Sequence, residues 1–225
     1  MILFEKTITL KNGKAAVLKT PDCGEGEQLL NFIKTSCGET EFLLRYPEEW
    51  SGVTVEYEEK WIKRSRESKN DLTIACYIDG EVAGNCSISF LGTMKTKHRA
   101  TIGISILKKY WGLGIGSALF RELISAAEAH EGTEIIELEF IEGNVRAQAL
   151  YEKFGFKIVC ERPNALKLKD GRMLKEIFMQ KNFKGRKYHE VDPIFFGFPK
   201  FQVRKIHSPA PRETHIRCKS FIFSQ

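Results

Sequence analysis

The sequence of 225 residues contains no apolar run near the roughly 20 residues that a membrane-spanning helix needs. Residues 1–11 alternate apolar and charged side chains, so they lack the basic stretch and apolar segment of a secretory signal. Hydrophobic residues make up 42% of the chain and charged residues 28%, which is typical of soluble globular proteins. We therefore expect a cytoplasmic protein with no membrane partner.

Metal-ligand spacings are also lacking. The six cysteines are scattered, with no Cys-x-x-Cys pair and no histidine cluster. Cys76 and Cys86 fall on the apolar side of two alternating stretches, so we expect small buried hydrophobic residues there rather than a redox pair. The sequence thus predicts no metal site.

An excess of positive charge is absent from most of the chain, although the net charge is +6. Residues 1–182 hold 26 basic and 26 acidic side chains, whereas residues 183–225 hold nine basic and three acidic ones. This location weakens any inference from net charge to a nucleic-acid-binding face, and we do not expect nucleic acid as a partner. Binding of nucleic acid through the basic tail alone stays open as an alternative.

Composition divides the chain into two parts. Its length allows one domain of ordinary size, which we assign to residues 1–182. Residues 183–225 are basic and rich in Phe and Pro, and they show no sustained helical or strand period. We place this extension outside the core fold, with packing of its aromatic side chains on the domain as the alternative.

The order of expected elements indicates a mixed α/β domain. Asn12-Gly13 and Asp79-Gly80 predict tight hairpin turns with a strand on either side of each, because these residues tolerate a positive φ. Apolar spacing predicts helices 27–37 and 56–68, strands 72–78, 82–90 and 100–107, helix 114–129, strand 135–141, helix 144–154, and strands 156–161 and 174–180. We expect a mostly antiparallel central sheet of about six to seven strands flanked by about four helices.

Glycines gather between the expected strand 100–107 and the helix that follows it. Gly112, Gly114 and Gly116 remove Cβ atoms where the chain could approach an anion, and the helix N-terminus adds positive potential. A tight turn whose glycines serve packing alone explains the pattern equally well. The spacing differs from the G-x-G-x-x-G of dinucleotide folds, and no G-x-x-x-x-G-K-[ST] motif of nucleotide triphosphatases occurs.

A second motif supports the first. Residues 144–156 read NVRAQALYEKFGF and match the pattern N-x-x-A-x-x-L-Y-x-K-x-G-F, and residues 111–116 read WGLGIG and match Q/R-x-x-G-x-G/A except at Trp111. Together the two motifs resemble the signatures of the GNAT superfamily of acyl-CoA-dependent N-acetyltransferases. The order of expected elements agrees with that family from about residue 14 to residue 181, which is nearly the whole domain.

The resemblance implies direct transfer of an acetyl group from acetyl-CoA to a primary amine of a small molecule or a protein N-terminus. Backbone groups at the end of the strand would contact the pantetheine arm, and Asn144 would lie beside the cofactor. The strand-end residues are Ile104, Ser105 and Ile106. The backbone amides that would bind the pyrophosphate are those of Gly112, Leu113, Gly114, Ile115, Gly116 and Ser117.

The same resemblance implies that Tyr151 is the general acid. A phenol with a pKa near about 10 is protonated at neutral pH and can donate to a leaving thiolate. By position alone Tyr151 would fill the core, because it shares one helix face with Ala147, Leu150 and Phe154. A non-catalytic acyl-CoA-binding module is the alternative function, favoured by Trp111 and by the lack of an obvious base.

The sequence says less about the acceptor amine than about the acetyl donor. Glu137 and Glu139 lie on one side of strand 135–141, where we expect the sheet to open, and both are candidate bases or surface charges. Segment 39–50 holds four glutamates that would suit a cationic amine, or it is a solvated loop anchored by its apolar residues Phe42, Leu43 and Trp50. The acceptor and the oligomeric state stay open, a homodimer included.

Overall fold

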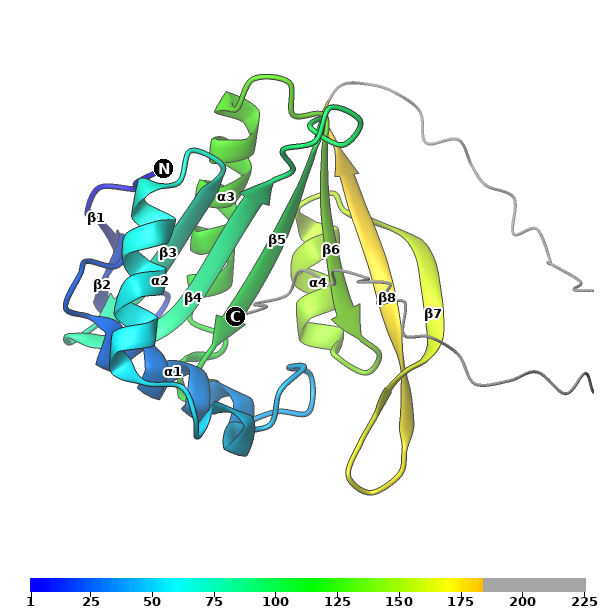
Figure 1. The fold of residues 1–225 in the computed structure, drawn as a ribbon, viewed down its shortest axis with the longest axis horizontal. Coiled ribbons are helices and arrows are strands. Elements are labelled where there is room, and N and C mark those ends of the chain that lie inside the picture. The colour runs from blue at the N-terminus through cyan, green and yellow to red at the C-terminus, as the bar shows by residue number, and fades with distance from the viewer. Residues whose placement is uncertain (184–225) are drawn as a thin grey trace, which may run out of the picture. The chain divides into compact units, whose positions relative to one another are not determined.

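The computed structural model describes residues 1–183, which contain eight strands and four α-helices. The extension expected at 183–225 lies outside the described residues from Lys184 onward. The elements are β1 Lys6–Thr9, β2 Ala15–Lys19, α1 Gly26–Gly38, the 3₁₀ helix η1 Pro47–Trp50, α2 Val55–Glu67, β3 Asp71–Ile78, β4 Glu81–Phe90, β5 Arg99–Ile106, the 3₁₀ helix η2 Lys108–Tyr110, α3 Ile115–Ala129, β6 Ile135–Ile141, α4 Val145–Lys153, β7 Lys157–Lys167 and β8 Met173–Asn182 (Figure 1).

The eight strands form one sheet in the order β1-β2-β3-β4-β5-β6-β8-β7. Neighbouring strands are antiparallel except β5 and β6, which are parallel. This confirms the expected mixed α/β fold with a mostly antiparallel sheet, although the sheet has more strands than the expected six to seven. The strands on either side of the Asn12-Gly13 turn are β1 and β2, as expected, and β1 is a four-residue edge strand with mostly exposed side chains.

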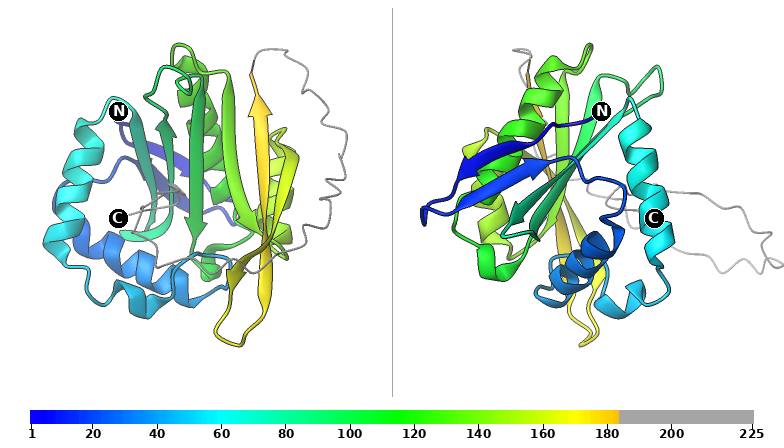
Figure 2. Two further views of the ribbon diagram at one scale, coloured as in Figure 1. Left: turned by 45° about the vertical axis from the view of Figure 1, so that its right-hand side comes forward. Right: turned by 90° about the vertical axis from the view of Figure 1, so that its left-hand side faces the viewer.

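Helices cover both faces of the sheet. α3 and α4 pack on one face, and α1 and α2 pack on the other (Figure 2). Side chains of β3 alternate between the two layers, so that Ile74 and Cys76 contact the α3 side and Ala75 and Tyr77 contact the α1–α2 side. Cys76 and Cys86 are fully buried, as expected of small hydrophobic residues, and burial raises the pKa of the Cys76 thiol to about 12.

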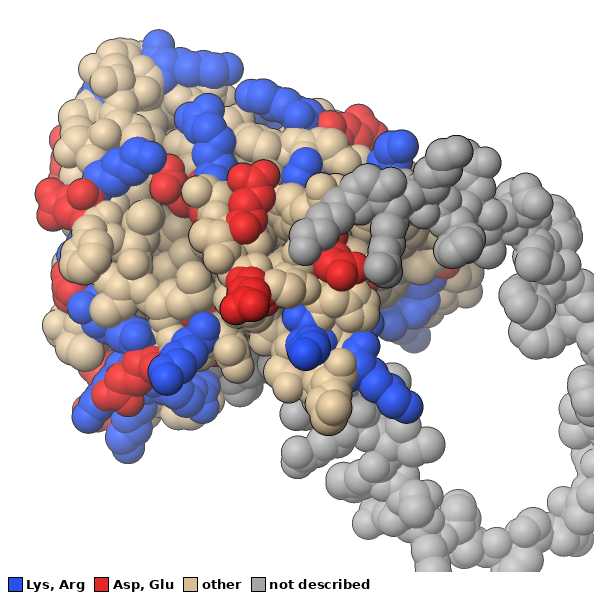
Figure 3. Space-filling view, turned by 90° about the horizontal axis from the view of Figure 1, so that it is seen from above, with Lys and Arg blue, Asp and Glu red and all other residues tan. Residues whose placement is uncertain are grey.

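Charges of both signs are mixed on the surface. In the view from above, Lys and Arg side chains lie among Asp and Glu side chains over the described residues (Figure 3). Some of them form ion pairs, such as Lys6 with Glu122 at 2.7 Å. The mixture agrees with the charge balance of residues 1–182. No helix within residues 1–183 is long and apolar enough to cross a membrane.

The parallel ladder between β5 and β6 is short. Arg99 pairs with Ile135, Ala100 with Ile136 and Thr101 with Glu137, and the pairing of the two strands ends there. β5 nevertheless continues to Ile106 and β6 to Ile141, and the two strands diverge beyond the ladder (Figure 1). The sheet therefore opens where the sequence predicted it would, and each strand there keeps hydrogen-bond partners on its other edge only.

Helix α3 supplies much of the core under the sheet. Leu119 and Leu123 recur at helical spacing and are both fully buried. Leu123→Ala should lower the free energy of unfolding by about 2–5 kcal/mol, because it leaves a cavity in a closely packed layer. Urea denaturation monitored by circular dichroism measures this loss. The exposed neighbour Arg121 provides the control, and Arg121→Ala should change stability by less than about 0.5 kcal/mol. Equal effects of the two substitutions would contradict the assignment.

Candidate functional site

The glycines between η2 and α3 serve two different purposes. Gly112 has φ +82° and Gly114 has φ +95°, a region of backbone conformation that strongly favours glycine. Gly116 has no positive φ, but a Cβ atom there would lie 3.1 Å from Leu150 and 3.3 Å from Ile106. The first two glycines therefore shape the turn, and the third allows α3 to pack closely against α4 and β5.

The N-terminus of α3 is suited to an anion. The first helical hydrogen bond runs from the Ala118 N–H to the Gly114 carbonyl at 3.1 Å, so that the N–H groups of residues 115–117 precede the helical ladder. No side chain caps this end, and no acidic residue lies in its first turn. Lys153 adds a positive charge, because its Nζ lies 3.1 Å from Ser117 Oγ. A phosphate group fits this arrangement of amides, helix dipole and cation.

Trp111 connects the glycine turn to its neighbours. Its indole Nε1–H donates to the Ile106 carbonyl at 2.7 Å, and the Arg146 guanidinium lies 4.7 Å from the centre of its rings. Trp111 thus holds the Arg146 cation of α4 beside the turn. The expected pattern has Gln or Arg at the position of Trp111. Sequence reasoning missed Arg146, because it occupies an unspecified position of the second motif.

The end of β5 is partly available for a ligand. Ile104, Ser105 and Ile106 pair with β4 on one edge, and the β6 ladder does not reach them on the other. The Ile106 carbonyl already accepts a hydrogen bond from Trp111. Of the backbone groups that were expected to contact a ligand, this carbonyl is therefore already in use. Contacts of Gly116 with both Ile106 and Leu150 bring the strand end, the glycine turn and α4 together.

Helix α4 begins and ends as the sequence indicates. The Ala147 N–H donates to Asn144 Oδ1 at 3.1 Å, so Asn144 is the N-cap, and Gly155 follows the helix with φ +84°. The side-chain oxygen of Asn144 therefore caps the helix, and its side-chain nitrogen takes no part in this hydrogen bond. Its expected place beside a cofactor stays a prediction.

Tyr151 lies in an aromatic cluster between α3, α4 and β6. Its ring centre is 5.4 Å from that of Phe120 and 5.6 Å from that of Phe140, and the residue is 6% exposed. Burial raises the pKa of the phenol, so the hydroxyl stays protonated at neutral pH. The ring thus belongs to the core.

The four glutamates of segment 39–50 all have protein partners. Trp50 is buried and packs with Leu43, which anchors the segment. The partners are the Lys108 N–H for Glu39 at 2.6 Å, Arg172 for Glu41 at 2.8 Å, Lys169 for Glu48, and the Tyr46 N–H for Glu49 at 2.6 Å. These contacts favour the anchored loop over a set of free carboxylates that waits for a cationic amine.

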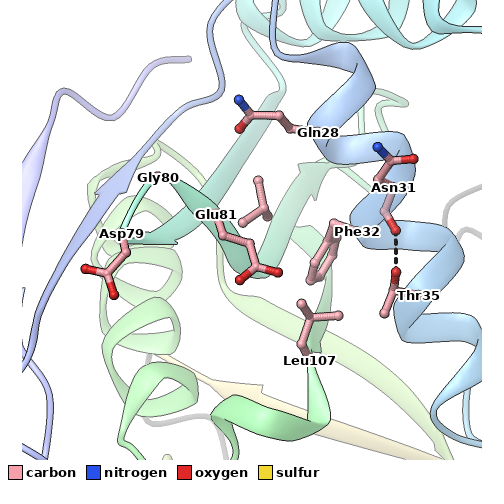
Figure 4. A pocket seen from close by; sticks show the side chains of 9 residues that line it. Gln28, Asn31, Phe32, Thr35, Asp79, Gly80, Glu81 and Leu107 are labelled. Atoms are coloured by element: carbon pink, nitrogen blue, oxygen red, sulfur yellow. Dashed lines mark hydrogen bonds between the residues drawn. The ribbon is translucent and has the colours of Figure 1, made fainter.

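A cavity of about 450 Å³ lies away from these motifs. It is located between α1, the β3–β4 turn and the residue that follows β5 (Figure 4). None of the predicted site residues lines it. Its lining residues are Gln28, Asn31, Phe32, Thr35, Asp79, Gly80, Glu81, Val82 and Leu107.

Comparisons with known proteins agree with the geometry. Residues 39–156 match the acetyltransferase (GNAT) family. Over 85 residues the chain is 34% identical to the L-amino acid N-acetyltransferase AaaT of Escherichia coli strain K12, a match that covers 38% of this chain and 52% of that protein. The chain therefore spans about half the length of that curated relative.

Solved structures share the fold over a larger part of the chain. A GNAT-family acetyltransferase of Streptococcus pneumoniae superposes with a TM-score of 0.69 at 25% identity, over 75% of this chain and 99% of that one. yncA of Salmonella typhimurium, solved with its cofactor acetyl-CoA, gives 0.65 at 16% identity, over 76% and 95%. A ribosomal-protein-alanine N-acetyltransferase of Brucella melitensis gives 0.64 at 22% identity, over 74% and 99%.

Replacement of a turn glycine tests the backbone requirement. Gly114→Ala should destabilise the protein by about 1–2 kcal/mol, because alanine is strained at a left-handed φ. Gly52→Ala is the control, since Gly52 has no positive φ and no atom lies within 4 Å of its added Cβ. Urea denaturation of both variants provides the measurement. Equal stability of the two would show that Gly114 is not required for the turn.

Proposed function

Because the chain belongs to the acetyltransferase (GNAT) family, we propose that it transfers the acetyl group of acetyl-CoA directly to a primary amine. The acceptor is a small molecule or a protein N-terminus, and the activity resides in residues 1–182. One observation carries the proposal: the uncapped N-terminus of α3 follows two left-handed glycines at the point where β5 and β6 part. This arrangement supports anion binding by those amides beside the opening in the sheet.

On the donor side, the backbone amides from Gly112 to Ser117 would bind the pyrophosphate, with Lys153 and Arg146 supplying positive charge nearby. The free edge of β5 at Ile104–Ile106 would hydrogen-bond the pantetheine arm, and Asn144 would lie beside it. The bound cofactor supplies an acetyl thioester that an amine can attack. No covalent acyl-enzyme is needed for this transfer.

Tyr151 would act as the general acid. Its protonated hydroxyl donates to the leaving sulfur as the carbon–sulfur bond breaks. The burial that raises the pKa of this phenol also raises the pKa of a thiol held in the same apolar surroundings, so proton transfer between them stays accessible. Packing against Phe120 and Phe140 fixes the direction of the hydroxyl.

Names of the similar proteins support an α-amino group as acceptor. One similar protein is an L-amino acid N-acetyltransferase and another a ribosomal-protein-alanine N-acetyltransferase, and both names specify a nitrogen of an amino acid or of an amino-acid residue. We therefore propose free amino acids or N-terminal residues ahead of side-chain amines. The anchored glutamates of segment 39–50 agree with this choice, because they leave no set of free carboxylates there for a polycation.

Isothermal titration tests the donor side. We expect acetyl-CoA to bind with a dissociation constant between about 1 μM and 1 mM, the usual range of enzyme KM values. Release of free thiol in the presence of the twenty L-amino acids, an alanine-terminated peptide and spermidine then tests transfer. Binding without turnover on any acceptor would favour a non-catalytic acyl-CoA-binding module. Absence of binding at millimolar acetyl-CoA would refute the proposal.

Substitution of the acid tests Tyr151. Tyr151→Phe should lower kcat at least about tenfold, because it removes the proton donor and keeps the ring in the core. The affinity for acetyl-CoA should not change. The exposed Tyr57 of α2 gives a matched control, and Tyr57→Phe should retain full turnover. Unchanged turnover of Tyr151→Phe would remove this residue from the mechanism.

A further inference from the structure

The cavity beside α1 has two polar walls that face each other. One wall is the side of α1 that carries Gln28, Asn31 and Thr35, which recur at helical spacing. The opposite wall is the β3–β4 turn at residues 79–81 (Figure 4). Its volume of about 450 Å³ lies in the usual range of small-molecule sites, roughly 300–1,000 Å³. A molecule of the size of an amino acid therefore fits between the walls.

The floor of the cavity is apolar. Phe32 of α1, Val82 of β4 and Leu107 line it, and all three are buried members of the cluster under α1 and α2. Figure 4 shows Phe32 and Leu107 between the two polar walls. An apolar group that covers these side chains leaves water, which favours its binding. The floor therefore suits a ligand with an apolar part.

Glu81 supplies a negative charge to the turn wall. Its carboxylate points toward the floor, whereas that of Asp79 points away (Figure 4). Lys109 Nζ donates to both Glu81 oxygens at 2.7 Å, and the Tyr110 hydroxyl donates to Oε2 at 2.8 Å. These hydrogen bonds lower the pKa of Glu81, so the group is ionised at neutral pH. Oε1 receives one of the three bonds, and an ionised carboxylate has about four acceptor sites, so Oε1 can also accept from a ligand.

The α1 wall supplies hydrogen-bond donors instead. Gln28 and Asn31 are exposed carboxamides, and each can turn its NH₂ group toward the cavity. The Thr35 hydroxyl donates to the backbone carbonyl of Asn31 at 2.8 Å, so this bond leaves the Asn31 carboxamide available. None of the lining residues is basic. An anionic group of a ligand would therefore bind at the α1 wall, and a cationic group at Glu81.

We propose that this cavity binds a free α-amino acid with an apolar side chain. The ammonium group of the ligand donates to Glu81 Oε1, and its carboxylate accepts from the carboxamides of Gln28 and Asn31. The apolar side chain of the ligand covers the floor between them. None of the residues assigned to acetyl transfer lines the cavity, so this site is separate from the catalytic one and goes beyond the proposed function.

Isothermal titration with L-phenylalanine, without acetyl-CoA, tests this site. Phenethylamine lacks the carboxylate and 3-phenylpropanoate lacks the ammonium group, so each should bind at least about tenfold more weakly than L-phenylalanine. Asn31→Leu, at an exposed helix position that leucine suits, should weaken L-phenylalanine binding about tenfold. Glu81→Gln should weaken it by at least as much. Glu128→Gln, the same change at an exposed position of α3, should keep the wild-type affinity.

The titration needs no turnover, so its result is independent of the proposed acetyl transfer. Weaker L-phenylalanine binding by Asn31→Leu, with the wild-type kcat for thiol release, supports a second site. Three results would overturn the proposal and leave the acetyl transfer intact: no binding of millimolar L-phenylalanine to the wild-type protein, wild-type affinity in both Asn31→Leu and Glu81→Gln, or equal affinity for L-phenylalanine and its two analogues.

Discussion

The three-residue ladder between β5 and β6 is the constraint on which the candidate site depends. A longer ladder would close the sheet and pair the backbone groups of Ile104–Ile106 with β6. Because pairing stops at Thr101 and Glu137, both strands keep free edges in the middle of an otherwise continuous sheet. Free backbone groups away from water need partners, which makes this opening a place where a ligand contributes hydrogen bonds.

Other parts of the domain converge on that opening. The glycine turn follows β5 and leads into α3, and a Cβ atom at Gly116 would lie only 3.1 Å from Leu150 of α4. Trp111 fixes the turn to the Ile106 carbonyl and holds Arg146 in place.

Local sequence signals predicted the elements that carry the site. Strand β6 has the expected bounds Ile135–Ile141, and α4 has its cap at Asn144, because apolar periodicity and capping residues act over a few positions. Contacts between residues far apart in the sequence could not be predicted from such local signals. The partners of segment 39–50 lie up to 131 residues away, as for Glu41 with Arg172, and the cation over Trp111 comes from another helix. The pairing of β7 with β8 likewise contains register shifts that no local sequence pattern predicts.

A crystal structure of the protein with acetyl-CoA and an unreactive amine tests the central claim most directly. We predict that the pyrophosphate contacts the amides between Gly112 and Ser117, and that the acetyl group lies between β5 and β6 beyond Glu137. The Tyr151 hydroxyl should then face the sulfur. Acetyl-CoA bound elsewhere, such as in the cavity beside α1, would contradict this arrangement.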